Sequence, residues 1–209
     1  EVFCRSLIAR GTTTAAVYST SHVESTDALF QAMFDAGLRG LVGLTLMNRA
    51  APASLCLSTA DAMRGSERLI ERWHLADDGR LEFCVTPRFA ISCTPDLLIA
   101  AGELARRFDL PVQTHISENH AEIAETAALF PDARDYLDVY ERVGLTTSRT
   151  ILAHCIHFDD SEWKRAAALG CGVSHCPDSN FFLGSGLMPL DKARTFGLKI
   201  GLGSDVGAG

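Results

Sequence analysis

Apolar runs bounded by turn residues recur along the chain, and segments with helical periodicity lie between them. The strand–helix–strand repeat is about 30 residues long and predicts a parallel sheet. The runs at 150–154 and 198–204 have almost no polar interruption, which is typical of strands covered on both faces. The predicted strands cover residues 13–20, 40–46, 81–86, 111–115, 150–154, 171–175 and 198–204.

Capping residues mark helices between these strands. Residues 25–27 (Ser-Thr-Asp) are expected to cap one helix, and residues 94–95 (Thr-Pro) supply a cap and a first-turn proline for another. Gly144 and Gly170 are expected to stop two further helices. The helix near 161–169 is predicted to bury Trp163, Ala166, Ala167 and Leu169.

Polar strand ends distinguish two architectures, an open doubly wound sheet and a (β/α)8 barrel of about 250 residues. An open sheet gathers ligands at one switch point and usually carries a glycine-rich phosphate loop. Here nearly every predicted strand ends in a polar residue, namely Arg88, His115, His154, His175 or Asp205. We therefore predict an α/β fold, an incomplete (β/α)8 TIM-type barrel of the metal-dependent hydrolase type. Residues 1–209 are expected to form a single catalytic barrel domain, with about seven of the eight strand units.

The composition limits the classes of partner. The chain is 47% hydrophobic and 22% charged, with a net charge of -7, as expected for a soluble globular protein. No cluster of Lys or Arg is interleaved with aromatic residues, so binding to nucleic acid polymers is disfavoured. No apolar stretch reaches the roughly 20 residues that cross a bilayer, and the N-terminus does not resemble a signal peptide. We therefore expect no membrane association and a cytoplasmic setting.

The 7 cysteines are interpreted as reduced, mainly buried thiols, because most of them lie within apolar runs. Cys155, Cys171 and Cys176 lie near His154 and His175 in the sequence, but no Cys-x-x-Cys pair exists. These spacings fit no common structural zinc motif, so a zinc knuckle is not expected.

His115 and Glu118 mark the end of the predicted strand 111–115. Alternation along this strand puts Gln113 and His115 on one face, so His115 is expected to point into the barrel mouth. A neutral imidazole binds zinc well, and a nearby carboxylate can move a proton from metal-bound water to a substrate nitrogen. Taken alone, the pair also fits a core histidine followed by a surface glutamate.

His154 closes another buried strand, and it is a candidate either to bind metal or to stabilise a metal hydroxide. His157, three residues further on, is a rival that we interpret as a hydrogen-bonded loop histidine. His22, His74 and His120 lie in polar or helical contexts and are given no role.

Asp205 follows the run Gly-Leu-Gly-Ser, whose small residues leave room beside its carboxylate. A carboxylate at the end of a buried strand is costly unless it is paired or bound to a cation. Asp205 is therefore predicted to be a metal ligand. One nitrogen ligand, one oxygen ligand and a water describe an open catalytic site.

Several strings resemble a known family over essentially the whole chain. The general likeness rests on residues 114–118 (Thr-His-Ile-Ser-Glu), 153–155 (Ala-His-Cys), 174–180 (Ser-His-Cys-Pro-Asp-Ser-Asn) and 201–205 (Gly-Leu-Gly-Ser-Asp). On these residues the chain resembles the amidohydrolase superfamily. A narrower likeness, to the guanine deaminases within it, rests on residues 85–93 (Val-Thr-Pro-Arg-Phe-Ala-Ile-Ser-Cys), 20–22 and 44–48. The segment 175–180 is interpreted as mainly a loop-shaping element.

The resemblance implies hydrolytic deamination of guanine to xanthine and ammonia by a zinc-activated hydroxide. It implies that His115 and Asp205 hold the zinc, that Glu118 shuttles protons and that His154 lies beside the water. Glu118, His154 and Asp205 are accordingly the expected catalytic residues, and a homodimer is the expected assembly.

The resemblance also implies that guanine contacts Arg88 and Phe89, in addition to the site residues His115, Glu118 and Asp205. A guanidinium suits the O6 and N7 edge of the purine, and an aromatic ring offers a face for the flat base. Arg88 would otherwise be read as an ordinary salt-bridge partner at a strand end.

One departure from the family pattern is that no His-x-His pair occurs in the sequence, although the family takes two further zinc ligands from such a pair. The chain begins with Glu1 rather than Met, so we expect a part of a longer protein with half of a metal site. A polypeptide limited to these residues is expected to be poorly soluble or inactive.

Two alternatives stay open from the sequence. The first is another aminohydrolase or chlorohydrolase of the superfamily, acting on a purine, an adenosine derivative or a triazine. The second is a non-catalytic fragment or relative. The metal could also be iron, since iron accepts the same nitrogen and oxygen ligands.

Overall fold

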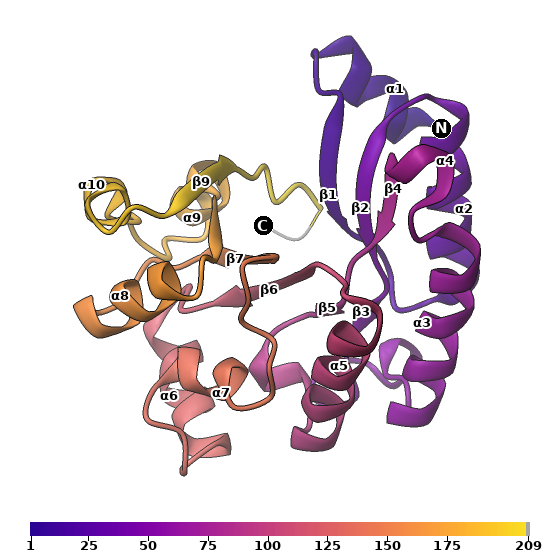
Figure 1. Ribbon diagram of the computed structural model, residues 1–209. Helices are drawn as coiled ribbons and strands as arrows, with labels where there is room; N and C mark the ends of the chain where they lie inside the picture. The colour runs from indigo at the N-terminus through magenta and orange to yellow at the C-terminus, as the bar shows by residue number, and fades with distance from the viewer. Residues whose placement is uncertain (208–209) are drawn as a thin grey trace. The chain divides into compact units, whose positions relative to one another are not determined.

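The computed structural model describes residues 1–207, which form two compact units (Figure 1). Unit 1 comprises Glu1–Arg88 and Ser92–Pro111, and unit 2 comprises Phe89–Ile91 and the described residues from Val112 onward. Each unit alternates strands with helices, as the sequence repeat predicts. The single catalytic domain over residues 1–209 stays a prediction.

Unit 1 contains two parallel sheets. β1 (Thr14–Tyr18) pairs with β2 (Arg39–Gly43), which pairs with β4 (Leu81–Phe83). β3 (Thr45–Leu46) pairs with β5 (Thr86–Pro87). The strands predicted at 40–46 and 81–86 are therefore both present, and each is interrupted once.

Two long helices line the three-stranded sheet of unit 1 (Figure 1). α2 (Val23–Asp35) packs on β2, and α3 (Thr59–Trp73) packs on β4 and on α5 (Pro95–Phe108). The buried rings of Phe30 and Trp73 stack with their centroids 5.5 Å apart and join α2 to α3. The shorter helical segments are α1 (Val2–Ala9), α4 (Ala76–Gly79) and the 3₁₀ turns Ala53–Leu55 and Ala90–Ser92, the last of which crosses the boundary between the units in sequence.

The start of α2 differs from the prediction. The helix begins at Val23 with His22 as its N-cap, so residues 25–27 lie within its first turns. The reason is tertiary, because Asp27 accepts a hydrogen bond from the indole N–H of Trp73 at 2.7 Å. This carboxylate is used to join two helices and is not a cap.

Unit 2 contains a four-stranded parallel sheet in the order β6-β7-β8-β9 (Figure 1). Its register sets Ile116 opposite His154 and His175 opposite Leu202, so the carboxyl ends of neighbouring strands lie level. These strands are β6 (Val112–Ile116), β7 (Thr150–His154), β8 (Gly172–His175) and β9 (Lys199–Leu202). The helices are α6 (His120–Leu129), α7 (Tyr136–Glu141), α8 (Asp160–Ala168), α9 (Pro177–Phe182) and α10 (Leu190–Thr195).

Other predicted helix ends are confirmed. Thr94 accepts a hydrogen bond from the backbone N–H of Leu97 at 3.4 Å, and Pro95 is the first residue of α5. Gly144 and Gly170 follow α7 and α8 with φ values of 73° and 77°, a left-handed backbone that favours glycine.

Two burial predictions are wrong in part. β9 is not covered on both faces, because Lys199, Gly201 and Leu202 are exposed, Leu202 by 84%, and Ile200 is only half-buried. In α8, Trp163 and Ala166 are buried as predicted. Ala167 is half-exposed although it lies four residues after Trp163, and Leu169 is half-exposed as the C-cap residue where α8 ends.

The cysteine interpretation is confirmed. Every cysteine is a free thiol, and Cys56 alone among them is not buried. Burial raises the pKa of the Cys155 thiol well above its ordinary value, and it also raises the pKa of Cys176, which suits inert core thiols. Across residues 1–207 no helix combines the length and apolarity needed to span a bilayer.

Candidate metal centre

Three side chains from the carboxyl ends of strands in unit 2 meet as potential metal ligands. His115 lies within β6, His154 is the last residue of β7, and Asp205 lies three residues beyond β9. One ligand atom from each falls within 4.8 Å of the others. The two imidazole rings are nearly parallel, with their centroids 5.4 Å apart. Parallel pairing thus brings together residues that are far apart in the sequence.

The backbone around this group is unusual. His154, Ser117 and Asp205 have φ values of 72°, 50° and 52°, in the left-handed region that residues other than glycine seldom adopt. Such conformations cost of order 1–3 kcal/mol each and tend to cluster at functional sites. All three lie at or just after the ends of strands that carry the donor group.

His154 is held by one ring nitrogen and presents the other. Its Nδ1 lies 2.8 Å from the amide oxygen Oδ1 of Asn180, an acceptor, so Nδ1 carries the proton. Its Nε2 therefore offers a lone pair, yet that atom is buried and has no hydrogen-bond partner among the described residues. The side chain is only 1% exposed, so water does not readily satisfy this nitrogen. Such an atom suits a metal ligand or a proton acceptor.

Two carboxylates face this nitrogen. Oε2 of Glu118 lies 3.8 Å from Nε2 of His154, and Oδ2 of Asp205 lies 4.0 Å from it. Within the described part of the chain neither carboxylate forms an ion pair with Lys or Arg. Two part-buried carboxylates thus face a buried imidazole with no Lys or Arg beside them, and nitrogen and oxygen donors of this kind suit zinc. The residues present therefore fit a bound metal ion.

The loop after β6 fixes the main chain of Glu118. Oε2 of Glu122 accepts hydrogen bonds from the backbone N–H groups of Glu118 at 2.8 Å and Asn119 at 3.3 Å. Asn119 in turn caps α6 by accepting from the backbone N–H of Glu122, which completes a capping box. Burial raises the pKa of the Glu122 carboxyl. The predicted place of Glu118, on the loop after the strand, agrees with this geometry.

Ser179 and Asn180 are site residues that the sequence interpretation missed. The segment 175–180 was expected to shape a loop, but Pro177–Phe182 forms α9. From this helix Ser179 Oγ donates to Oδ2 of Asp205 at 2.6 Å, and Asn180 holds His154. Pro177 at the first helical position was the available signal for a helix that carries both residues.

A buried tyrosine, Tyr140, is hydrogen-bonded to the main chain of His115. Tyr140 donates from its hydroxyl to the backbone carbonyl of His115 at 3.0 Å and accepts from Oγ1 of Thr114 at 3.1 Å. Its side chain is fully buried in α7. These bonds fix the end of β6 and, with it, the direction of the His115 side chain.

The remaining histidines of unit 2 lie outside the donor group. His157 lies in the turn after β7, with its Nε2 3.0 Å from the carbonyl oxygen of Ser185, as expected for a loop histidine. Its ring lies against that of His120, with the centroids 4.0 Å apart.

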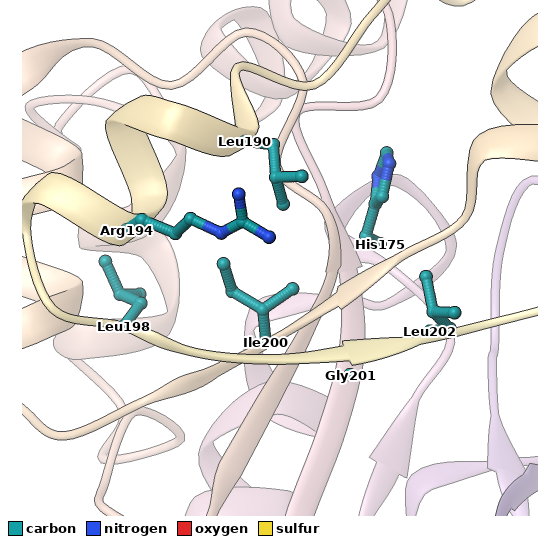
Figure 2. A pocket seen from close by; sticks show the side chains of 7 residues that line it. All are labelled: His175, Leu190, Arg194, Leu198, Ile200, Gly201 and Leu202. Carbon is teal, nitrogen blue, oxygen red and sulfur yellow. The ribbon is translucent and has the colours of Figure 1, made fainter.

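His175, another polar strand end, lines a separate pocket of unit 2 (Figure 2). The pocket is mostly apolar, with the Arg194 guanidinium reaching across it. Desolvation lowers the pKa of His175. The other lining residues are Leu190, Leu198, Ile200, Gly201 and Leu202.

The strand-end residues Arg88 and Phe89 directly follow β5. The backbone N–H of Arg88 donates to the carbonyl of Leu46 at 3.1 Å, which continues the β3–β5 pairing and aligns the strand ends. The Arg88 side chain is exposed, and Phe89 is half-buried. Their contact with substrate stays a prediction.

Known proteins resemble the chain over its full length. It is 42% identical over 208 residues to guanine deaminase of Escherichia coli strain K12, a match that covers 99% of this chain and 47% of that protein. It matches the crystal structure of guanine deaminase from C. acetobutylicum with bound guanine at a TM-score of 0.94 and 35% identity, over 100% of this chain and 50% of that one. The chain thus spans about half the length of these relatives.

More distant structures share the fold alone. A triazine hydrolase from Arthrobacter aurescens matches at a TM-score of 0.85 but at 20% identity, over 98% of this chain and 48% of that one. These likenesses confirm the predicted fold class, the (β/α)8 barrel of metal-dependent hydrolases. The model of the amidohydrolase family matches residues 1–209. The chain therefore belongs to the amidohydrolase family.

Proposed function

We propose that the full-length protein deaminates guanine hydrolytically and releases xanthine and ammonia. The observation that carries this proposal is the unpartnered Nε2 of His154, which faces the carboxylates of Glu118 and Asp205 beside His115. The 42% identity to a guanine deaminase supports the choice of substrate.

We propose zinc as the metal, with His115 and Asp205 as ligands that this chain supplies. Zinc, when bound, supplies Lewis acidity that brings the pKa of a water near neutrality. The Ser179 hydroxyl, which donates to Oδ2 of Asp205, holds that carboxylate in the direction of the histidines. The donor atoms of His115, Asp205 and His154 are close enough to share one ion.

Glu118 is the proposed proton carrier. Its Oε2 faces the donor group, so it can accept a proton from the attacking water and deliver it to N3 of guanine, and then assist departure of the C2 amine as ammonia. His154, with its lone pair at Nε2, is placed to accept a hydrogen bond from that water and orient it toward C2.

Arg88 and Phe89 are the proposed substrate contacts. An exposed guanidinium at a strand end can donate two hydrogen bonds to O6 and N7 of a purine, and a half-buried ring can lie against its face. A homodimer and a cytoplasmic setting remain part of this proposal, as the sequence predicts them.

The test is to supply the zinc-loaded, full-length protein with guanine and to measure both ammonia and xanthine. We expect release of both in equal amounts, with much slower turnover of adenine and of chlorotriazines. Equal turnover of those compounds would move the assignment to another aminohydrolase or chlorohydrolase. No turnover of any of them by zinc-loaded protein would favour a non-catalytic relative.

The substrate contact is tested separately. Arg88→Ala should raise the KM for guanine by about 10-fold or more, because a charged hydrogen bond is lost, and should leave the zinc content unchanged. Arg106→Ala, which removes an exposed arginine of α5, is the matched control and should behave like the unchanged protein.

A further inference from the structure

We propose that Ser185 is a positioning residue that selects which oxygen of Glu118 carries protons; this inference rests on the proposed function. Ser185 Oγ donates a hydrogen bond to Oε1 of Glu118 at 3.0 Å. The other oxygen, Oε2, is the one that lies 3.8 Å from the unpartnered Nε2 of His154. One oxygen is thus anchored and the other is directed at the donor group.

Anchoring is useful because a glutamate side chain is flexible. Its χ torsions let the carboxylate swing, and an off-target position of about 1 Å can cost about 100-fold in rate. The capping box of α6 fixes only the main chain of Glu118. Among the described residues, the Ser185 hydroxyl supplies the hydrogen bond that fixes its carboxylate group.

The loop that carries Ser185 is itself held at several points. The backbone N–H of Ser185 donates to the carbonyl of Asn180 at 2.9 Å, and its carbonyl oxygen lies 3.0 Å from Nε2 of His157. Gly186 has φ of 131°, and a Cβ there would lie 3.0 Å from Cγ2 of Ile156. Met188, two residues further on, is buried, whereas Leu187 between them is exposed. The hydroxyl is therefore presented from a fixed backbone.

This arrangement makes α9 and its following loop a common support for three of the four site residues. Ser179 contacts Asp205, Asn180 contacts His154, and Ser185 contacts Glu118. Because Ser185 forms no hydrogen bond with a candidate metal ligand among the described residues, its loss should separate proton transfer from metal binding.

The experiment compares Ser185→Ala and Ser185→Thr with the unchanged full-length protein. Ser185→Ala should lower kcat for guanine by about 10- to 100-fold, the loss expected for a hydrogen bond to a charged group. KM should change less than about threefold, and the zinc content should not change. Ser185→Thr retains a hydroxyl and should recover most of kcat. Ser161→Ala, on the exposed side of α8, is the control.

Crystal structures of the same variants give a readout that does not depend on turnover. The Glu118 carboxylate should occupy one position in the unchanged protein and in Ser185→Thr, and should be displaced or split between positions in Ser185→Ala. An unchanged kcat in Ser185→Ala, or a parallel loss of zinc, would overturn the inference. If the unchanged protein turns over no guanine, the proposed function fails, and an unmoved Glu118 in Ser185→Ala then overturns the positioning role independently.

Discussion

Two groups of charged residues in unit 2 are built in opposite ways. The first is the metal-centre cluster, made of His115, Glu118, His154 and Asp205, where two carboxylates face the buried imidazole of His154. The second is the α7 ion-pair network, where each carboxylate is matched by a guanidinium. Its members are Asp135, Asp138, Glu141, Arg134, Arg142 and Arg165.

In the α7 ion-pair network every carboxylate forms an ion pair with an arginine of the same network. Arg165 bridges Asp135 at 2.6 Å and Glu141 at 3.1 Å, and its pKa is raised by these two carboxylates despite partial burial. Burial would raise the pKa of Asp138, but the backbone N–H of Arg134 and the guanidinium of Arg142 lower it overall. Among residues 1–207, Glu118 and Asp205 accept hydrogen bonds from serine hydroxyls but pair with no guanidinium, so the difference indicates that one group stabilises the fold and the other is kept ready for a cation.

The largest expected effect is the loss of metal and activity when a ligand of the metal-centre cluster is replaced. Asp205→Asn should remove most of the bound metal and lower kcat/KM by about 1,000-fold or more, since a ligand to the ion that activates water is lost. The unfolding free energy of metal-free protein should stay equal or rise, because an uncompensated charge disappears. Metal analysis, kinetics and urea titration measure these quantities.

Asp191→Asn is the control for that variant, because Asp191 is a fully exposed carboxylate of α10. It should leave metal content and activity unchanged. If Asp205→Asn instead destabilised the metal-free protein strongly, the contrast between the cluster and the network would be broken.

The next effect concerns the proton carrier. Glu118→Gln should lower kcat by about 100- to 10,000-fold, the usual contribution of a general acid or base, and should retain the metal. The amide oxygen can still accept from Ser185, so the side chain should keep its place. Loss of metal together with activity would show that Glu118 acts as a ligand.

Substitutions in the α7 ion-pair network should lower stability and leave metal binding and activity unchanged, the opposite of what is expected for the metal-centre cluster. Arg165→Met should lower the unfolding free energy by about 2–3 kcal/mol, because two part-buried carboxylates each lose one of their two guanidinium partners and keep only the more exposed Arg134. Metal content and kcat should be unaffected. Arg64→Met removes an arginine from an exposed pair with Asp61 and should cost less than about 0.5 kcal/mol in the same urea titration.

The smallest expected effect is a pH-dependent change in folding stability that comes from Glu162. Burial raises the pKa of Glu162 to about 7 from an ordinary value of 4.5. The folded state therefore binds more protons than the unfolded state between these pH values, so stability falls as pH rises through that window. Glu162→Gln keeps an acceptor for the backbone N–H of Asp159 and should remove this dependence.

We expect Glu162→Gln to be more stable than the unchanged protein by about 1 kcal/mol at pH 8, with the advantage vanishing near pH 5. Thermal unfolding of both proteins across this range measures it. An advantage that does not change with pH would mean that the carboxylate is not the cause.

The sequence alone determined the alternation of strands and helices and identified the strands that end in candidate catalytic or metal-binding residues. Long apolar runs must be buried, and parallel strands joined by helices bring their carboxyl ends to one edge. This physical rule was sufficient to place His115, His154 and Asp205 together, and Glu118 on the adjoining loop. The sequence also identified the helix stops at Gly144 and Gly170, because a left-handed backbone at the end of a helix favours glycine.

Only the tertiary structure decided how these groups are held. The sequence predicts that Asp27 helps to cap a helix, but its carboxylate instead accepts a hydrogen bond from the indole N–H of Trp73 on another helix. Likewise, nothing local to Asn180 or Ser185 predicts their contacts with His154 and Glu118, because those partners are 26 and 67 residues away. Short-range patterns determine elements and their ends, whereas the partner of a polar side chain depends on distances that exist only after the strands have paired.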